Sequence, residues 1–382
     1  MQIAKLTVYR IKIPFRQVFR HATATRSYAE NIVVRCEDTT GLVGWGETIA
    51  REYVTGETTA QTIERYRAIP KSLFNKQFRT AMDVETFLDQ AGFDSFNVAR
   101  CGIEMALLDL MARLKNQPLY AYCAVEFADH IAIEHTDDIF RYGGAIGLSP
   151  VGKTIVNALK MRLYGFNSVK LKLECDFSED VKRIAIVRRI LGRRIDLRVD
   201  ANEAWDTSYA TKITPYMEKY GVSAVEQPFA KTDVSAYEKM FDATCIPVIL
   251  DESLCTLADA HAFEKFADKI IFCIKLPKTG GFFYAFRLFS FARQHSIPIQ
   301  LSCQVGESAI LSAGGRQAAM LCPNLRYLEG SFDRYLLRSN IIANDISFGY
   351  GGKAGLLNSP GLGISVDEGL LEQITEEKIG LV

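Results

Sequence analysis

Ser168-Val-Lys-Leu-Lys-Leu173 is a short run in which charged and apolar residues alternate. Successive side chains of a β-strand point to opposite faces, so this alternation predicts a strand with Lys170 and Lys172 on one face. The apolar side chains take the other face, as in a strand that packs against helices. An isolated Lys-x-Lys pair more often marks an exposed edge or the polar rim of a sheet. The meaning of this pair therefore depends on the residues that follow it.

Four charged residues follow Lys172 at nearly even spacings of 28, 26, 25 and 24 residues, each at the end of an apolar run: Asp200, Glu226, Asp251 and Lys275. A strand, a helix and two turns take about that many residues, so each group should end a successive strand of a repeating βα array. In a parallel barrel the carboxyl ends of the strands meet at one mouth, where catalytic groups collect. The spacing therefore predicts that these side chains converge.

The expected array covers residues 131–345 and contains eight strands, with helical patterns in the seven gaps between them. The expected strands are 142–147, 168–173, 196–200, 222–226, 247–251, 270–275, 297–302 and 325–329. No helical pattern of similar length follows the last strand. The fold class is therefore α/β, a modified (β/α)7β barrel of the TIM type.

The rest of the chain follows a different pattern. Residues 1–130 predict an α+β capping domain, because residues 31–36, a turn at 38–41 and residues 42–47 read as an antiparallel hairpin. Apolar residues at helical spacing predict a helix over Arg100–Lys115. The loop-rich segment 346–382 is expected to return to the capping domain.

Composition limits the classes of function. Hydrophobic residues make up 48% of the 382 residues, as in a globular protein with a sizeable core. Lys+Arg and Asp+Glu balance at 45 each, which argues against nucleic acid or an anionic membrane as a partner. The nine cysteines form no C-x-x-C pair, and no apolar run approaches the ~20 residues of a membrane helix. We expect a cytoplasmic protein with reduced thiols.

The three acidic residues predict a metal site. A lone carboxylate at the end of a strand is more often a helix cap or a turn residue. Three carboxylates at consecutive strand ends would repel one another unless a cation lay between them, and hard oxygen ligands suit Mg²⁺. We expect Asp200, Glu226 and Asp251 to be the ligands, with Asn202 and Glu252 orienting them. The inward lysines flanking this cation then read as acid/base groups, with Lys278 as a competitor to Lys275.

These motifs closely resemble those of the enolase superfamily, in particular its muconate-lactonizing subgroup. The resemblance rests on Lys-x-Lys, Val199-Asp-Ala-Asn202, Glu226-Gln-Pro228, Asp251-Glu-Ser253 and Lys275-Leu-Pro-Lys-Thr-Gly-Gly281, in this order and spacing. It implies a lysine base and Mg²⁺ stabilising an enediolate formed by loss of the proton beside a carboxylate. It further implies that Lys172 and Lys275 are bases on opposite faces and that Lys170 is an electrostatic partner of the substrate carboxylate. A histidine base would have indicated the mandelate racemase subgroup.

One motif departs from the subgroup's pattern. Dipeptide epimerases carry Asp-x-Asp after the eighth strand, where it binds the amino group of the substrate. Here the pair becomes Glu329/Ser331 or Ser331/Asp333, depending on register, and a turn without any substrate role is an equal alternative. Glu307 either lines the site or caps a helix that begins at Ser308.

In the capping domain, three residues lie in segments that match the two loops that close over substrate in this family. These substrate-binding candidates are Arg26, Arg51 and Tyr53.

The expected function is Mg²⁺-dependent epimerisation or racemisation of a small-molecule carboxylate, a dipeptide or an N-acyl amino acid. The alternatives are a cycloisomerase or dehydratase of the muconate or o-succinylbenzoate type, a Schiff-base aldolase using one of the lysines, and a non-catalytic barrel that binds a ligand. The family's habit implies a homo-oligomer.

Overall fold

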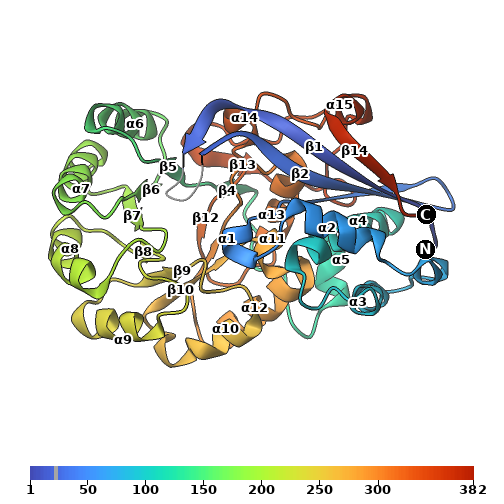
Figure 1. The fold of residues 1–382 in the computed structure, drawn as a ribbon, viewed down its shortest axis with the longest axis horizontal. Coiled ribbons are helices and arrows are strands. Elements are labelled where there is room, and N and C mark those ends of the chain that lie inside the picture. Colours follow the sequence, from blue (N-terminus) through green and yellow to red (C-terminus); the bar gives the residue numbers. More distant parts are fainter. Residues whose placement is uncertain (21–24) are drawn as a thin grey trace.

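A computed structural model describes residues 1–20 and 25–382, and its side chains are described for residues 1–17 and 26–382. Its larger part is an eight-stranded parallel sheet in which the strands follow one another in chain order. The Gly143 amide donates to the Leu328 carbonyl at 2.8 Å, which brings the two end strands together into a barrel (Figure 1). The strands are β5 (Gly144–Ile146), β6 (Ser168–Lys172), β7 (Asp196–Asp200), β8 (Val225–Glu226), β9 (Val248–Leu250), β10 (Ile270–Ile274), β11 (Ile299–Leu301) and β12 (Leu325–Leu328).

Helices fill the gaps between successive barrel strands and cover the outside of the barrel (Figure 1). They are α6 (Val151–Leu163), α7 (Phe177–Leu191), α8 (Thr207–Lys219), α9 (Val234–Ala243), α10 (Leu257–Ala262) with the 3-10 turn η2 (Glu264–Phe266), α11 (Leu276–Thr279) with α12 (Phe282–Gln294), and α13 (Ala309–Ala319). After β12 there is only the four-residue α14 (Asp333–Leu336) where an eighth helix would stand. The predicted (β/α)7β architecture is confirmed.

The amino-terminal part is built on a four-stranded antiparallel sheet in the order β14-β1-β2-β3. The predicted hairpin is formed by β2 and β3, and β14 pairs with β1, so the carboxyl-terminal segment lies against the amino-terminal one. The elements before the barrel are β1 (Ile3–Arg20), β2 (Thr25–Asp38), β3 (Val43–Thr48), α1 (Glu52–Thr55), α2 (Thr59–Arg67), η1 (Lys71–Asn75), α3 (Ala81–Gln90), α4 (Asn97–Leu114), α5 (Leu119–Glu126) and β4 (Ile139–Arg141). Those after α14 are η3 (Tyr350–Gly352), β13 (Lys353–Gly355), α15 (Glu368–Gln373) and β14 (Thr375–Gly380).

Helix α4 joins the two parts of the molecule. It is buried along most of its length, as expected of a helix that is apolar on several sides. Gly44 and Gly46 of β3 face it, and a Cβ at either position would lie within 2.3 Å of an α4 carbonyl oxygen. Glycine therefore permits this close packing, which fixes the capping sheet relative to the barrel.

Hydrogen bonds from the capping sheet to the loop after β11 fix the cap over the mouth of the barrel. Asn31 Nδ2 donates to the Gly306 carbonyl at 2.9 Å, and Glu47 accepts from the Ser308 amide at 2.9 Å and from its hydroxyl at 2.6 Å. All three side chains are fully buried. The cap is thus held directly above the carboxyl ends of the strands.

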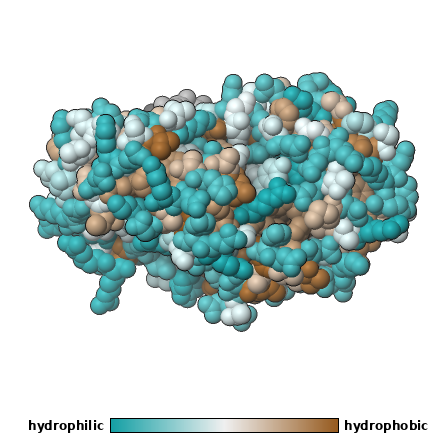
Figure 2. Space-filling view, turned by 90° about the horizontal axis from the view of Figure 1, so that it is seen from below, coloured by the Kyte–Doolittle hydropathy of each residue, from teal (hydrophilic) through white to brown (hydrophobic). Residues whose placement is uncertain are grey.

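The surface carries mainly polar side chains. Figure 2 shows one face on which hydrophilic residues predominate and hydrophobic ones form separate patches, as is usual for a folded protein. Among the described residues, none of the helices has the length and apolar character needed to span a membrane.

Candidate active site

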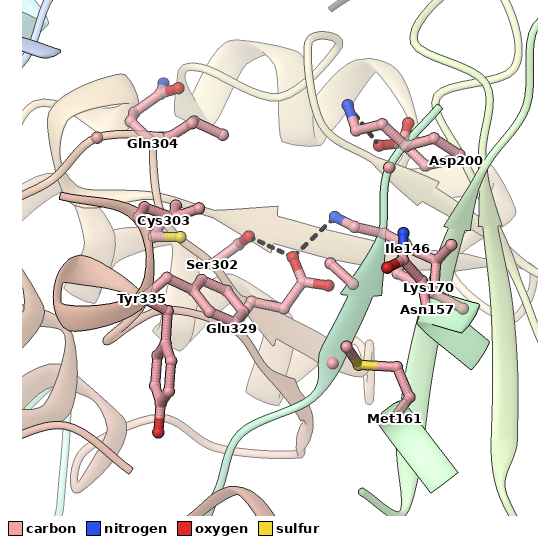
Figure 3. A pocket seen from close by; sticks show the side chains of 18 of the residues that line it. Ile146, Asn157, Met161, Lys170, Asp200, Ser302, Cys303, Gln304, Glu329 and Tyr335 are labelled. Carbon is pink, nitrogen blue, oxygen red and sulfur yellow. Dashed lines mark hydrogen bonds and ion pairs between the residues drawn. The ribbon is translucent and has the colours of Figure 1, made fainter. Parts of the chain in front are cut away.

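A cavity of about 1280 Å³ opens at the carboxyl ends of the barrel strands, beneath the cap. The structure brings together the six residues on which the sequence prediction of chemistry rests, and all of them line this cavity: Lys170, Lys172, Asp200, Glu226, Asp251 and Lys275. Figure 3 shows part of the cavity, with Lys170 and Asp200 on one side and Ser302, Cys303 and Glu329 on the other. The predicted convergence at the strand ends is therefore present.

Lys170 lies between two carboxylates. Its Nζ donates to both oxygens of Glu226, at 2.9 and 3.1 Å, and to Oε2 of Glu329 at 2.7 Å. Burial lowers the pKa of Lys170, but the two carboxylates outweigh burial and raise it well above its ordinary value. Lys170 is therefore a fixed cation at neutral pH, which suits a group that attracts an anion and does not exchange protons.

Lys172, at the end of β6, is held more loosely. Its Nζ donates to Oδ1 of Asn202 at 2.6 Å and lies 3.4 Å from Oδ2 of Asp200. The Asn202 amide donates to the other oxygen of Asp200 at 3.1 Å. Asn202 therefore contacts both the carboxylate and the amine, as expected of a residue that orients them.

Lys275 follows β10 and pairs with Asp251. Its Nζ donates to Oδ2 of Asp251 at 2.5 Å, while Lys278 donates to Oδ1 at 3.0 Å and to the Asp251 carbonyl at 2.6 Å. Burial lowers the pKa of Lys275, but Asp251 outweighs burial and raises it well above its ordinary value. Lys278 is fully buried and does not line the cavity, so of the two competitors Lys275 is the one that faces the site.

Lys172 and Lys275 approach the site from opposite sides. They end the second and the sixth of the eight strands, β6 and β10, and β7, β8 and β9 separate them in the sheet. In a closed barrel of eight strands, positions four strands apart lie across the diameter. A substrate carbon held between them would be open to one amine on each face.

The carboxylates have the chemistry of a site for a hard cation. Asp200, Glu226 and Asp251 are 2%, 1% and 3% exposed, and they end β7, end β8 and follow β9. Oxygens of Glu226 and Asp251 and Sγ of Cys273 lie within 4.8 Å of one another. Burial raises the pKa of the Cys273 thiol, and a soft sulfur ligand does not suit a hard cation such as Mg²⁺. The oxygen donors, completed by Asp200, fit Mg²⁺.

The three candidates after β12 are engaged by the protein itself. Besides Lys170, Glu329 accepts from Ser302 Oγ at 2.9 Å and lies 3.2 Å from Nη2 of Arg198. Burial raises the pKa of Glu329, but the ion pairs outweigh it and lower the pKa to about 2.

Ser331 and Asp333 are bound from the barrel wall. The Ser331 hydroxyl accepts from Arg316 at 2.9 Å. Asp333 accepts from Ser312 at 3.2 Å and from Asn340 at 2.8 Å. All three residues after β12 line the cavity, yet none of their carboxylates is without a partner.

Glu252 and Glu307 are buried carboxyls with a raised pKa. Burial, reinforced by Asp251, raises the pKa of Glu252 to about 8. Its Oε2 has no hydrogen-bond partner among the described residues, and its role in orienting the carboxylates stays a prediction. Burial raises the pKa of Glu307 to about 8 as well, with Glu47 adding to the effect and the hydrogen bond from the Gln304 amide opposing it. Ser308 itself caps α13, and Glu307 lines the cavity.

The raised pKa of Glu307 predicts a pH-dependent stability. Between the ordinary pKa of 4.5 and about 8, the folded state keeps a proton that the unfolded state has lost, so stability falls as pH rises. Glu307→Gln mimics the protonated form. Its free energy of unfolding should therefore rise relative to that of the wild type by up to about 1.4 kcal/mol per pH unit across this window. Urea unfolding of both proteins at pH 5, 6.5 and 8 measures the difference. A constant difference would contradict the prediction.

The three candidate residues of the cap differ in whether they line the cavity. Arg26 and Tyr53 line the cavity, with the Arg26 guanidinium 5.9 Å from the Tyr53 ring centre. Arg51 does not line it: the residue is 5% exposed, and its guanidinium donates to the carbonyls of Ala50 and Val305. Burial lowers the pKa of Arg51 to about 10. Arg51 thus fastens the cap to the barrel loop, and its contact with substrate stays a prediction.

A layer of polar side chains below the site was missed by the sequence prediction. Arg198 is fully buried, donates to Gln300 Oε1 and packs 4.0 Å from the Tyr327 ring centre. Gln300 in turn donates to Oε2 of Glu226 at 2.9 Å. The signal was available, because Arg198-x-Asp200 and Gln300-x-Ser302 have the same alternation as Lys170-x-Lys172.

The sequence matches two families along nearly its whole length. Residues 4–122 match the mandelate racemase / muconate lactonizing enzyme N-terminal domain, and residues 154–370 match the enolase C-terminal domain-like family. The chain belongs to the enolase superfamily. The match to the N-terminal family and the racemases and epimerases described next place it in the muconate-lactonizing subgroup, as the motifs predicted.

Proteins of established activity resemble the chain over its full length. It is 28% identical to N-succinyl-L-Arg/Lys racemase of Bacillus cereus, over 98% of each chain. It is 29% identical to L-Lys-D/L-Arg epimerase of Methylococcus capsulatus, covering 95% of this chain and 99% of that protein. The dipeptide epimerase structure from Methylococcus capsulatus, complexed with Mg and the dipeptide L-Arg-D-Lys, superposes with a TM-score of 0.83 at 27% identity, over 96% and 100% of the two chains.

The predictions of family, fold class and enzyme class are confirmed by these matches. The chain is an enzyme of a superfamily whose similar members are racemases, epimerases and a cycloisomerase. The roles of the individual site residues stay predictions and are argued next.

Proposed function

We propose that this enzyme racemises or epimerises an N-acyl amino acid by removing the proton from its α-carbon and returning it on the other face. The observation that carries the proposal is the placement of Lys172 and Lys275 across the barrel from each other. An enzyme that inverts a carbon centre needs a proton acceptor on one face and a proton donor on the other. A cycloisomerase or dehydratase needs only one such group.

Each lysine has a distinct task in this proposal. Lys275 is held protonated by Asp251 in the resting site, so it is ready to donate its proton to the α-carbon. Lys172 faces the opposite side of the substrate and accepts the α-proton, with Asn202 fixing the direction of its amine. For the opposite enantiomer the two lysines exchange roles. Lys170 stays charged and attracts the substrate carboxylate.

Asp200, Glu226 and Asp251 would hold a magnesium ion, whose charge stabilises the electron density that collects on the substrate carboxylate when the α-proton leaves. The support within this chain is the burial of three carboxylates whose only cationic neighbours are lysines of the same site among the described residues. Similar enzymes were solved with Mg and a dipeptide.

The side chains after β12 favour an acylated nitrogen over a free ammonium group. A free amino group would need an accessible carboxylate, but Glu329 is already paired with Lys170 and Arg198. Asp333 is buried and accepts two hydrogen bonds from the barrel, and Glu307 is protonated at neutral pH because of its raised pKa. A neutral amide needs no accessible carboxylate as a partner, so an N-acyl amino acid fits the site better than a dipeptide with a free amino end.

The proposal predicts α-deuterium uptake. Incubation with Mg²⁺ in D₂O should place deuterium at the α-carbon of N-acyl amino acids, with uptake at least about tenfold faster than for dipeptides of the same residues, which corresponds to about 1.4 kcal/mol. Mass spectrometry of a pool of both classes reads the uptake, and polarimetry follows inversion. Faster uptake by free-amino dipeptides would overturn the choice of substrate class. Absence of uptake in both pools would shift the function to cycloisomerisation or dehydration.

We also propose that the enzyme is cytoplasmic and assembles as a homo-oligomer. The nine cysteines are all free in the structure, which suits a reducing compartment. The proposal of an oligomer is based on the common oligomeric state of the superfamily. Light scattering at micromolar concentration measures the molar mass and tests this proposal.

A further inference from the structure

The cavity is larger than the proposed chemistry requires. Its volume of about 1280 Å³ exceeds the about 300–1,000 Å³ that is usual for small-molecule sites. The catalytic lysines and carboxylates occupy one end of it. The rest continues past β5 toward α6 on the outside of the barrel. Figure 3 shows Glu329 and Tyr335 on one side of this space and Asn157 and Met161 on the other.

The extension exists because the barrel is joined weakly between its end strands. The hydrogen bond from Gly143, just before β5, to Leu328, the last residue of β12, is the backbone bond that joins the two end strands among the described residues. No full-length helix follows β12, so none of the described helices packs on α6 on this side. The cavity therefore passes between the end strands and along α6. We call this extension, bounded by Ile146, Asn157, Met161, Tyr335 and Phe348, the side arm.

Aromatic side chains build the far end of the side arm. The hydroxyls of Tyr164 and Tyr335 lie 2.7 Å apart, and Tyr335 also donates to the Phe348 carbonyl at 2.8 Å. The rings of Tyr335 and Phe348 stack with their centres 5.0 Å apart. These contacts join the end of α6 to α14 and to the segment before η3. The side arm is therefore a walled space that suits an apolar chain.

The rim of the side arm carries positive charge without a countercharge. Lys153 and Lys160 of α6 both line the cavity, and neither forms an ion pair with any described residue. They are seven residues apart, which places them about 10 Å apart along one face of the helix. Most acidic residues of the cavity lie at its catalytic end, and Asp333 of α14, which also lines the cavity, is buried and accepts hydrogen bonds from Ser312 and Asn340. An anion at the outer end of the side arm would be attracted and not repelled.

We propose that the side arm binds the distal end of the substrate, an apolar chain that ends in a carboxylate. The proposal rests on the proposed function only in placing the substrate's α-carboxylate at the catalytic end. The chain then lies between Met161 and the Tyr335–Phe348 stack, and its terminal carboxylate reaches Lys153 or Lys160. The enzyme is thus specific for dianionic substrates, whose second carboxylate comes either from the N-acyl group or from the amino-acid side chain.

Binding of glycine derivatives in the presence of Mg²⁺ tests whether the side arm recognises a terminal carboxylate. By calorimetry, N-adipoyl-glycine should bind the wild-type enzyme about tenfold more tightly than N-hexanoyl-glycine, which has the same chain length without the terminal carboxylate. The double variant Lys153→Glu/Lys160→Glu should lose this preference. Arg189→Glu, an exposed charge reversal on α7 outside the cavity, controls for the general field and should keep it. Equal affinities both in this pair and in the side-chain pair described next, or a preference that survives the double variant, would overturn the proposal.

A second ligand distinguishes the two sources of the carboxylate. N-acetyl-2-aminoadipate carries the second carboxylate on its side chain, and N-acetyl-norleucine is its uncharged counterpart. If the preference that the double variant abolishes appears in this pair and not in the glycine pair, the side arm takes the side chain. If it appears in the glycine pair, the side arm takes the acyl group. If it appears in neither, the side arm binds no second carboxylate.

A steric variant tests the position. Asn157→Trp should fill the side arm and weaken both six-carbon glycine ligands about tenfold, while binding of N-acetyl-glycine stays unchanged. Val156→Trp, on the neighbouring exposed position that does not line the cavity, is the matched control. An equal loss for every ligand, N-acetyl-glycine included, or no loss either for the six-carbon glycine ligands or for N-acetyl-2-aminoadipate, would contradict the placement.

The same ligands separate failure of the side arm from failure of the proposed function. Exchange of the glycine α-protons in D₂O reports on the lysines, whereas calorimetry reports on binding. A charge preference without exchange would leave the side arm in place and refute the proposed function. Exchange without a charge preference in either ligand pair would support the proposed function and refute the side arm.

Discussion

Replacing either Lys172 or Lys275 by methionine should abolish racemisation while the protein stays folded. Methionine keeps most of the length of lysine but can neither accept nor donate a proton. Loss of one acid/base group typically costs about 10²–10⁴-fold in rate, and inversion needs both groups. Polarimetry with a single enantiomer of an N-acyl amino acid measures the loss, and circular dichroism with thermal unfolding checks the fold.

The two variants should differ in which enantiomer they still deuterate. Because the lysines lie on opposite sides of the cavity, each enantiomer presents its α-proton to only one of them. Lys172→Met should keep exchange with D₂O for the enantiomer that faces Lys275, and Lys275→Met should keep it for the other. Lys182→Met, an exposed lysine of α7, is the control and should behave as wild type. Full inversion by both active-site variants would refute the two-base assignment.

The fold should survive these substitutions because the partner carboxylates keep other contacts. In Lys275→Met, Asp251 still accepts from Lys278 at 3.0 Å. In Lys172→Met, Asp200 still accepts from the Asn202 amide at 3.1 Å. Neither variant leaves a buried carboxylate without a hydrogen bond, which is the usual cause of severe destabilisation when an ion pair is broken. Their activity loss can therefore be assigned to chemistry.

The barrel and its catalytic end were predictable from sequence because both depend on local rules. Alternation in 168–173 places Lys170 and Lys172 on one face, and the even spacing of the acidic residues follows from the length of a βα unit. Parallel strand ends must then meet at one mouth. The convergence of Asp200, Glu226 and Asp251 is thus a consequence of secondary structure and connectivity alone.

The remaining features depend on which side chains meet across the barrel, and sequence periodicity does not contain that information. Lys278 competed with Lys275 for the acid/base role, yet its amine is buried against Asp251. Arg51 looked like a substrate ligand, yet it binds the Val305 carbonyl of the barrel. The side arm arises from the absence of an eighth helix and from aromatic residues more than 150 positions apart, Tyr164 and Tyr335, that meet only in the folded chain.

Removing the metal should be as damaging as removing a base. Treatment with EDTA should abolish α-deuterium uptake, and Mg²⁺ should restore it, because the charge that develops on the substrate carboxylate then lacks its main stabiliser. Asp200→Asn is the sharpest variant, since it removes one charged ligand and keeps the size of the side chain. It also leaves the pairs of Lys170 with Glu226 and of Lys275 with Asp251 intact.

We expect Asp200→Asn to lower kcat/KM by about 10³-fold, equivalent to about 4 kcal/mol of transition-state stabilisation, and to weaken Mg²⁺ binding in calorimetry. Part of the activity should return at high Mg²⁺ concentration, which a purely structural defect would not show. Asp196→Asn is the matched control, because Asp196 begins the same strand at the opposite end and accepts from Ser223 Oγ at 2.8 Å. Asp200 would be excluded as a metal ligand if Asp200→Asn bound Mg²⁺ with wild-type affinity or if EDTA left turnover unchanged. The Asp200 carboxylate, which is 2% exposed and lies between β6 and β8, would then act only as an ion-pair partner of the lysines.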